Sequence, residues 1–107
     1  MTDKVIAYTT CGSAEDAEEI AEHLIDLHLA ACVNVVPEIT SYYRWKGKVE
    51  RDTEYLLMIK TARSLIEPLR HELEKIHKYE LPELIVIPIV DGSPNYLNWV
   101  DGEVAEA

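Results

Sequence analysis

The sequence predicts an α+β domain of the split βαβ type, and two observations lead to this prediction. The first is the order of the segments, which read as strand, helix, strand, strand, helix, strand and helix. The second is a hairpin over residues 32–61, whose arms are each much longer than the roughly five or six residues of a usual strand. All 107 residues fit one domain, residues 1–107.

The composition excludes several classes of partner. The chain has 20 acidic and 10 basic residues and a net charge of −10, so it lacks the clustered positive charge that nucleic acid requires. No apolar run approaches the roughly 20 residues that span a bilayer, and no apolar signal segment is visible. We therefore expect a cytoplasmic protein with no nucleic-acid or membrane partner.

The first strand and helix are predicted from residues 4–29. Residues 4–10 are largely β-branched and aromatic, which is typical of a buried strand. Ser13 is a good N-cap for a helix that we expect to end near Leu29, and the acidic residues of its first turns are favoured by the helix dipole. In the split βαβ topology, this helix and the second long helix cover the same face of an antiparallel sheet.

The hairpin is the longest predicted feature. Pro37 cannot donate to the strand ladder and predicts a bend or bulge in the first arm, and Lys46-Gly47 predicts a two-residue turn. Residues 55–59 are apolar on both faces, which predicts a central strand that is covered on each side. The outer half must project, and we expect it to pair with other copies of the chain through strand pairing, which would hide an exposed edge.

The second half of the chain predicts a helix, a strand and a short final helix. Ser64 with Glu67 predicts a capping box, and the helix that follows is expected to end near His77. Residues 84–90 read as a strand, and Pro88 within it suggests an edge position or a bulge. Ser93 caps the last helix, and residues 101–107 are expected to fray.

Five blocks of the chain carry a family resemblance. They are residues 29–34 (LAACVN), 41–47 (SYYRWKG), 57–61 (LMIKT), 77–83 (HKYELPE) and 96–99 (YLNW). Together they resemble the CutA family of divalent-cation tolerance proteins, which are similar in structure to PII signalling proteins. The resemblance implies a ferredoxin-like subunit with a long hairpin and a short C-terminal helix, assembled as a homotrimer. It also implies binding of copper or another divalent cation, which we do not expect folding to require.

The resemblance also bears on the position of a metal site. In some members copper is assigned to a cysteine of the first strand and two adjacent histidines. Thr9 and Ile76 occupy two of these positions here, and only His77 matches. The predicted topology places Cys11 near His77, so we take His77 and Cys11 as candidate metal ligands, a donor pair that suits copper or zinc. The alternative is structural, with Cys11 a small residue at a strand end and His77 a helix C-terminal residue.

A second candidate site is a ligand-binding cleft between subunits. Its expected residues are Trp45, Lys60, Tyr79, Glu80 and Glu83. The alternative interpretation is core packing or a subunit interface for the aromatic residues, and surface ion pairs for Lys60 and Glu83. A PII-like trimer would bind a small anionic ligand or a partner protein in this cleft.

Catalysis and disulfide formation have little support in the sequence. No Gly-rich phosphate loop and no Ser/His/Asp or Cys/His motif stands out, so we expect a protein that is not an enzyme. Cys11 and Cys32 are predicted at opposite edges of the sheet. Because bridged Cα atoms must lie within about 7 Å, we expect no disulfide between them.

Overall fold

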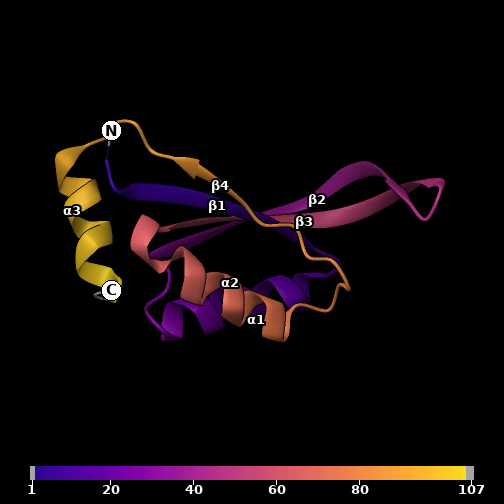
Figure 1. Cartoon of the computed structure of the whole chain (residues 1–107), viewed down its shortest axis with the longest axis horizontal. Coiled ribbons are helices and arrows are strands. Elements are labelled where there is room, and N and C mark those ends of the chain that lie inside the picture. Colours follow the sequence, from indigo (N-terminus) through magenta and orange to yellow (C-terminus); the bar gives the residue numbers. More distant parts are fainter. Residues whose placement is uncertain (1, 106–107) are drawn as a thin grey trace.

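Four antiparallel strands form one sheet in the order β2-β3-β1-β4 (Figure 1). The computed structural model describes residues 2–105. The strands are β1 (Lys4–Cys11), β2 (Cys32–Trp45), β3 (Lys48–Ala62) and β4 (Ile85–Pro88). The helices are α1 (Ala14–Asp26), α2 (Ile66–Ile76) and α3 (Pro94–Glu103), and a 3-10 turn, η1 (Arg63–Leu65), precedes α2. This is the predicted split βαβ topology.

The core lies between the sheet and the helices α1 and α2, which cover one of its faces (Figure 1). Leu57 and Ile59 of β3 point into this core and are fully buried. They pack with buried aliphatic residues of the two helices, namely Ile20, Leu24, Leu69 and Leu73. Burying a side chain of this size contributes roughly 1.5–3 kcal/mol, so this face of the sheet stabilises the subunit by itself.

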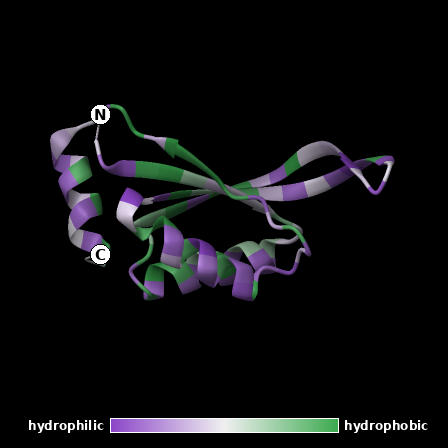
Figure 2. Cartoon of the chain, viewed as in Figure 1, coloured by the Kyte–Doolittle hydropathy of each residue, from purple (hydrophilic) through white to green (hydrophobic). Residues whose placement is uncertain are grey.

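The opposite face of the sheet is uncovered in the single chain. We call it the bare face, and it carries the side chains that alternate with the core-facing ones: Ile6, Tyr8, Leu56, Met58, Ile85 and Ile87. Figure 2 shows hydrophobic colour along β1 and β4. The prediction that residues 55–59 are covered on both sides is therefore wrong for one subunit, in which only the helical side is covered.

The hairpin projects beyond the body of the subunit, as predicted (Figure 1). Its register shifts between Val36 and Ile39, which places a bulge at the predicted bend around Pro37. At the tip, Lys46 and Gly47 have φ values of 49° and 84°. Two successive left-handed residues are typical of a type I′ turn, whose twist matches that of the flanking strands.

Two helix boundaries differ from prediction. Helix α1 ends at Asp26, because His28 adopts a left-handed φ of 58° and the Leu27 and Leu29 amides donate back to the carbonyls of the last turn. Ser64 does not cap α2, since it lies within η1 and the N-cap residue is Leu65, without a side-chain hydrogen bond. The predicted caps at Ser13 and Ser93 are confirmed.

The C-terminal segment is better ordered than predicted. Helix α3 continues to Glu103, and the Ala105 amide donates a hydrogen bond of 2.8 Å to the His28 carbonyl. Residues 106 and 107 of the predicted fraying tail lie outside the described residues. Both cysteines are free thiols, as expected. Across residues 2–105, every helix is too short or too polar to cross a membrane.

Candidate functional site

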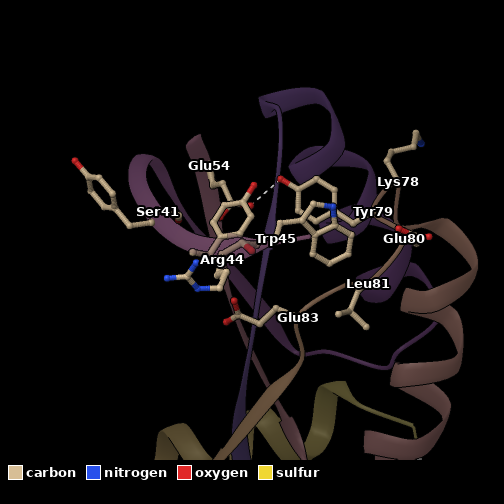
Figure 3. Close-up of a pocket in the computed structure, with 12 residues that line it drawn as sticks. Ser41, Arg44, Trp45, Glu54, Lys78, Tyr79, Glu80, Leu81 and Glu83 are labelled. Atoms are coloured by element: carbon tan, nitrogen blue, oxygen red, sulfur yellow. Dashed lines mark hydrogen bonds between the residues drawn. The ribbon is translucent and has the colours of Figure 1, made fainter. Parts of the chain in front are cut away.

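An open cleft of about 770 Å³ lies between the outer half of the hairpin and the loop of residues 77–84 that follows α2 (Figure 3). Four of its lining side chains are aromatic and three are carboxylates: Tyr42, Tyr43, Trp45 and Tyr79, with Glu54, Glu80 and Glu83. Arg44 and Lys78 are its basic residues, and Thr10, Ser41 and Leu81 complete the lining. The cleft thus combines aromatic walls with an excess of acidic groups.

His77 fixes the start of the cleft loop. It is the C-cap of α2, and its backbone turns to an extended conformation there. Its Nε2 lies 2.8 Å from the Thr10 carbonyl oxygen, and its Nδ1 accepts a hydrogen bond of 3.0 Å from the Tyr79 amide. A carbonyl can only accept, so Nε2 carries the hydrogen and Nδ1 is the acceptor. The neutral ring therefore joins the end of β1 to the loop.

Tyr79 joins the loop of residues 77–84 to β3. Its hydroxyl donates a hydrogen bond of 2.7 Å to Glu54 Oε2 (Figure 3). Burial and this carboxylate raise the pKa of Tyr79, so its hydroxyl stays a neutral donor. Tyr79 packs beside Gly12, where an added Cβ would lie in van der Waals contact, 3.4 Å from the Tyr79 hydroxyl oxygen.

Two carboxylates of the cleft interact electrostatically. Glu54 is only 7% exposed, and Glu83 lies in the same cleft. Partial burial of its carboxyl group raises the pKa of Glu83, and the charge of Glu54 raises it further. Glu83 is exposed as a whole residue and lines the cleft. A cation bound here would relieve this repulsion.

The basic residue Lys78 is directed away from these carboxylates. Its ammonium group lies 3.0 Å from Glu19 Oε1 and 4.0 Å from Asp16 Oδ1, both on α1. The hydrogen bond with Glu19 raises the pKa of Lys78, so it keeps its charge in that pair. Lys78 therefore offsets little of the negative charge in the cleft.

The predicted metal ligands come from neighbouring segments but do not form a ready donor set. Cys11 is 1% exposed and its Sγ contacts the Ser13 carbonyl oxygen at 3.6 Å, while burial raises the pKa of its thiol. Both ring nitrogens of His77 are engaged, so a metal ion there would have to displace a hydrogen bond. Among residues 2–105, no three His, Cys, Asp or Glu side chains gather closely enough to hold a metal ion. Metal binding by His77 and Cys11 stays a prediction.

The predicted cleft residues fall into two groups. Trp45, Tyr79, Glu80 and Glu83 line a cleft of the single chain, whereas the prediction placed the ligand-binding cleft between subunits. Lys60 does not line it, because it pairs with Cys32 at the other end of β3 and its ammonium group donates to Asn34 Oδ1.

Glu54 was missed in the sequence. The sequence feature that could have pointed to Glu54 is its position directly before the apolar stretch 55–59. A carboxylate on a strand that enters the core needs a hydrogen-bond donor. In the structure that donor is the Tyr79 hydroxyl.

Comparisons with known proteins agree on one family. The family described as "CutA1 divalent ion tolerance protein" matches residues 5–103. The chain is 51% identical to a Protein CutA homolog of Xenopus laevis over 100 residues, which cover 94% of this chain and 66% of that protein. It is 41% identical to the divalent-cation tolerance protein CutA of Thermus thermophilus over 95 residues, covering 89% of this chain and 92% of that protein.

Solved structures show the same fold. The crystal structure of CutA1 from Oryza sativa superposes with a TM-score of 0.95 at 40% identity, covering 97% of this chain and 95% of that one. The Thermus thermophilus divalent cation tolerance protein gives a TM-score of 0.93 at 38% identity, covering 95% and 99% of the two chains. The chain spans 66% of the length of the Xenopus relative and 53% of that of the mouse Protein CutA.

Proposed function

Because the chain belongs to the CutA1 divalent ion tolerance protein family, we propose that it acts as a homotrimer that binds divalent cations in the cleft. The proposal has two parts, an assembly through the bare face and a cation site at Glu54 and Glu83. It assigns no catalytic step to the chain. The cytoplasmic location also stays a prediction.

The bare face supports the assembly. Ile85 and Ile87 are 52% and 43% exposed on it, beside the half-buried Leu56 and Met58. A contiguous apolar surface of this kind on a sheet is typical of an interaction site. The edges β2 and β4 also offer unpaired backbone groups, and the projecting hairpin can reach a neighbouring copy. Other copies of the chain would cover both features at once.

The electrostatic interaction between Glu54 and Glu83, two carboxylates that line the same cleft, is the observation that carries the cation site. Glu54 and Glu83 supply oxygen ligands, which divalent cations such as Mn²⁺ and Mg²⁺ prefer. Burial raises the pKa of Glu83 and the Glu54 charge raises it further, and a bound cation would balance that charge. Copper prefers nitrogen and sulfur ligands, so we expect it to bind at Cys11 and His77. A ring nitrogen of His77 would first have to give up its hydrogen bond.

Isothermal titration calorimetry with MnCl₂, ZnCl₂ and CuSO₄ tests this proposal. We expect one Mn²⁺ site for each chain, lost in Glu83→Gln and kept in Cys11→Ser. Glu74→Gln is the matched control, because Glu74 is an exposed carboxylate on α2 outside the cleft. If no divalent cation binds, or if Glu83→Gln leaves the Mn²⁺ isotherm unchanged, the carboxylate site is wrong. Copper binding that only Cys11→Ser abolishes would support the His77–Cys11 site in its place.

A further inference from the structure

We propose that neighbouring copies of the chain recognise each other through opposite charges on the two faces of the projecting hairpin, residues 39–54. The acidic face of one hairpin packs against the basic face of the next. The inference rests on the proposed homotrimer. It goes further, because it names two surfaces, the charged residues that distinguish them and the order in which neighbouring copies pair.

One face of this hairpin is acidic. Because side chains alternate along a strand, Glu50, Asp52 and Glu54 of β3 lie on the same side as Tyr43 of β2, whose Cα partner is Glu50. The Tyr43 hydroxyl donates a hydrogen bond to Asp52, which raises the pKa of Tyr43, and the charges of Glu54 and Glu50 raise this pKa further. We call this side the acidic face. Within residues 39–54 its one basic residue is Lys48, beside the turn.

The opposite face of the hairpin is basic. It carries Arg44 and Arg51 together with Tyr42 and Val49, and no carboxylate of residues 40–53 lies on it. Arg51 donates a hydrogen bond of 2.9 Å to the Tyr42 hydroxyl, and its guanidinium group lies 5.7 Å from the centroid of the Tyr42 ring. Tyr42 and Val49 are each 68% exposed. This side, which we call the basic face, therefore presents apolar surface beside its positive charge.

The charges of both faces lack ionic partners within the single chain. Among residues 2–105, Arg44, Arg51, Glu50 and Asp52 form no ion pair. The hairpin projects beyond α1 and α2, so these helices do not cover its outer part (Figure 1). In Figure 3, Arg44 and Trp45 point away from each other from neighbouring positions of β2. Each face thus keeps charges that a second copy can pair with.

The acidic face continues the bare face. Asp52 and Glu54 alternate along β3 in step with Leu56 and Met58, so the two surfaces lie on the same side of the strand. A neighbour that covers the bare face therefore also meets the acidic face. Four of the 10 basic residues of the chain lie within residues 44–51, so the projecting hairpin of that neighbour is the most basic segment it can offer.

Opposite charges on opposite faces suit a cyclic assembly. In a ring, every interface joins two different surfaces of the chain, whereas a two-fold dimer places the same surface on both sides of its interface. A two-fold contact through either face of the hairpin would bring like charges together, which is unfavourable. The charge pattern therefore favours the head-to-tail contacts of a homotrimer.

Charge reversal at Arg44 and Glu50 tests the inference, because within residues 2–105 neither side chain takes part in a hydrogen bond or an ion pair. Arg44→Glu, Glu50→Arg and the double variant are compared with the wild type by multi-angle light scattering over a dilution series in about 50 mM NaCl, where screening is weak. Arg63→Glu and Glu74→Arg make the same charge changes at exposed positions outside the hairpin and serve as matched controls. Circular dichroism checks that each variant keeps its fold.

We expect each single hairpin variant to raise the concentration at which the assembly dissociates by at least about tenfold, because like charges then meet across the interface. The double variant exchanges the two charges and should return this concentration towards that of the wild type. At about 1 M NaCl the differences should shrink. Recovery in the double variant reports contact between copies, since the two side chains lie on opposite faces of their own hairpin.

Two results overturn the inference. One is that the single hairpin variants assemble like the controls, and the other is that the double variant dissociates as readily as the single ones. Both results leave the proposed homotrimer standing. A wild-type protein that is itself a monomer contradicts the homotrimer and the inference with it, so the two failures are distinguishable.

Discussion

The Tyr79 hydroxyl donates a hydrogen bond of 2.7 Å to Glu54 Oε2, and this bond joins two walls of the cleft that lie 25 residues apart in the chain. Together with the His77–Thr10 contact, it holds the loop of residues 77–84 against the sheet. The cleft is therefore shaped by hydrogen bonds between segments that lie far apart in the chain. Its rigidity can be tested one bond at a time.

Tyr79→Phe removes this hydrogen bond and leaves the ring. A hydrogen bond to a charged group contributes about 1.5–3 kcal/mol, so we expect a loss of stability of about that size and weaker cation binding, because Glu54 is freed to move. Urea unfolding at a fixed chain concentration measures the first effect. Tyr96→Phe on exposed α3 is the control and should change little. Equal stability of the Tyr79 and Tyr96 variants would mean that the bond does not anchor the loop.

The left-handed turn at the hairpin tip can be tested by replacing Gly47 with alanine and comparing the effect with that of the same change at a helical glycine. Gly47 has a φ of 84°, and an alanine there would be strained by about 1–2 kcal/mol although no atom lies within 4 Å of its Cβ. Gly102 lies in α3 with equally open surroundings, so Gly102→Ala should stabilise the protein by up to about 1 kcal/mol. Thermal unfolding should shift in opposite directions. A shift of the same sign in both variants contradicts the assigned turn.

The contact between α1 and α2 should make stability depend on pH. His23 Nε2 lies 2.9 Å from Glu72 Oε1, and the hydrogen bond with His23, with help from Lys75, lowers the pKa of Glu72. A carboxyl whose pKa is lower in the folded state stabilises the fold above its unfolded pKa. This stabilisation is lost as the pH falls through the folded pKa, below the ordinary 4.5.

Glu72→Gln measures this contribution. The variant should be less stable than the wild type at pH 7, and the difference should shrink as the pH falls below about 4.5. Chemical unfolding over this pH range, with Glu74→Gln as the control, tests the prediction. A difference that is constant with pH would show that the effect does not come from the ionised Glu72.

Glu83 should show the opposite sign, because the cleft raises its pKa. A carboxyl whose pKa is raised on folding favours the fold at low pH, and this contribution is lost as the pH rises through the folded pKa. Glu83→Gln should therefore stabilise the ligand-free protein at pH 7 while it abolishes Mn²⁺ binding. In the wild type, Mn²⁺ affinity should decrease as the pH is lowered, because Glu83 becomes protonated. The midpoint of this decrease should lie above the ordinary pKa of 4.5. A midpoint below 4.5 would contradict the raised pKa.

The sequence predicted the fold better than the site, for physical reasons. Strands, caps at Ser13 and Ser93 and the Lys46-Gly47 turn depend on local patterns, and the structure confirms them. Lys60 was assigned to the cleft although strand alternation and register place it beside Asn34. The partner of Glu54 depends on how the loop after α2 returns to the sheet, and no local pattern encodes that contact.

The covering of the sheet shows the same limit of local patterns. Apolar residues on both faces of 55–59 correctly indicated a central strand, and β3 lies between β1 and β2. They could not indicate whether the second cover comes from the same chain. In the subunit, Leu56 and Met58 lie on the bare face, so the cover must come from elsewhere if those residues are buried in solution.

Met58→Glu places a charge in the centre of the bare face. We expect it to dissociate the assembly, because burying an unpaired carboxylate in an interface is strongly unfavourable. Lys60→Glu at the rim of the same face serves as the control and should weaken the assembly less. Circular dichroism checks that each variant keeps its fold. A Met58→Glu protein with the mass of the wild type would exclude the bare face as the interface.

The mass of the wild-type protein in solution, measured by multi-angle light scattering, tests the central claim most directly. The claim is that the bare face belongs to a homotrimer. Three chains of 12.2 kDa predict a mass of about 37 kDa that persists on dilution to micromolar concentration. A mass of 12.2 kDa, with the bare face exposed to solvent, would contradict it.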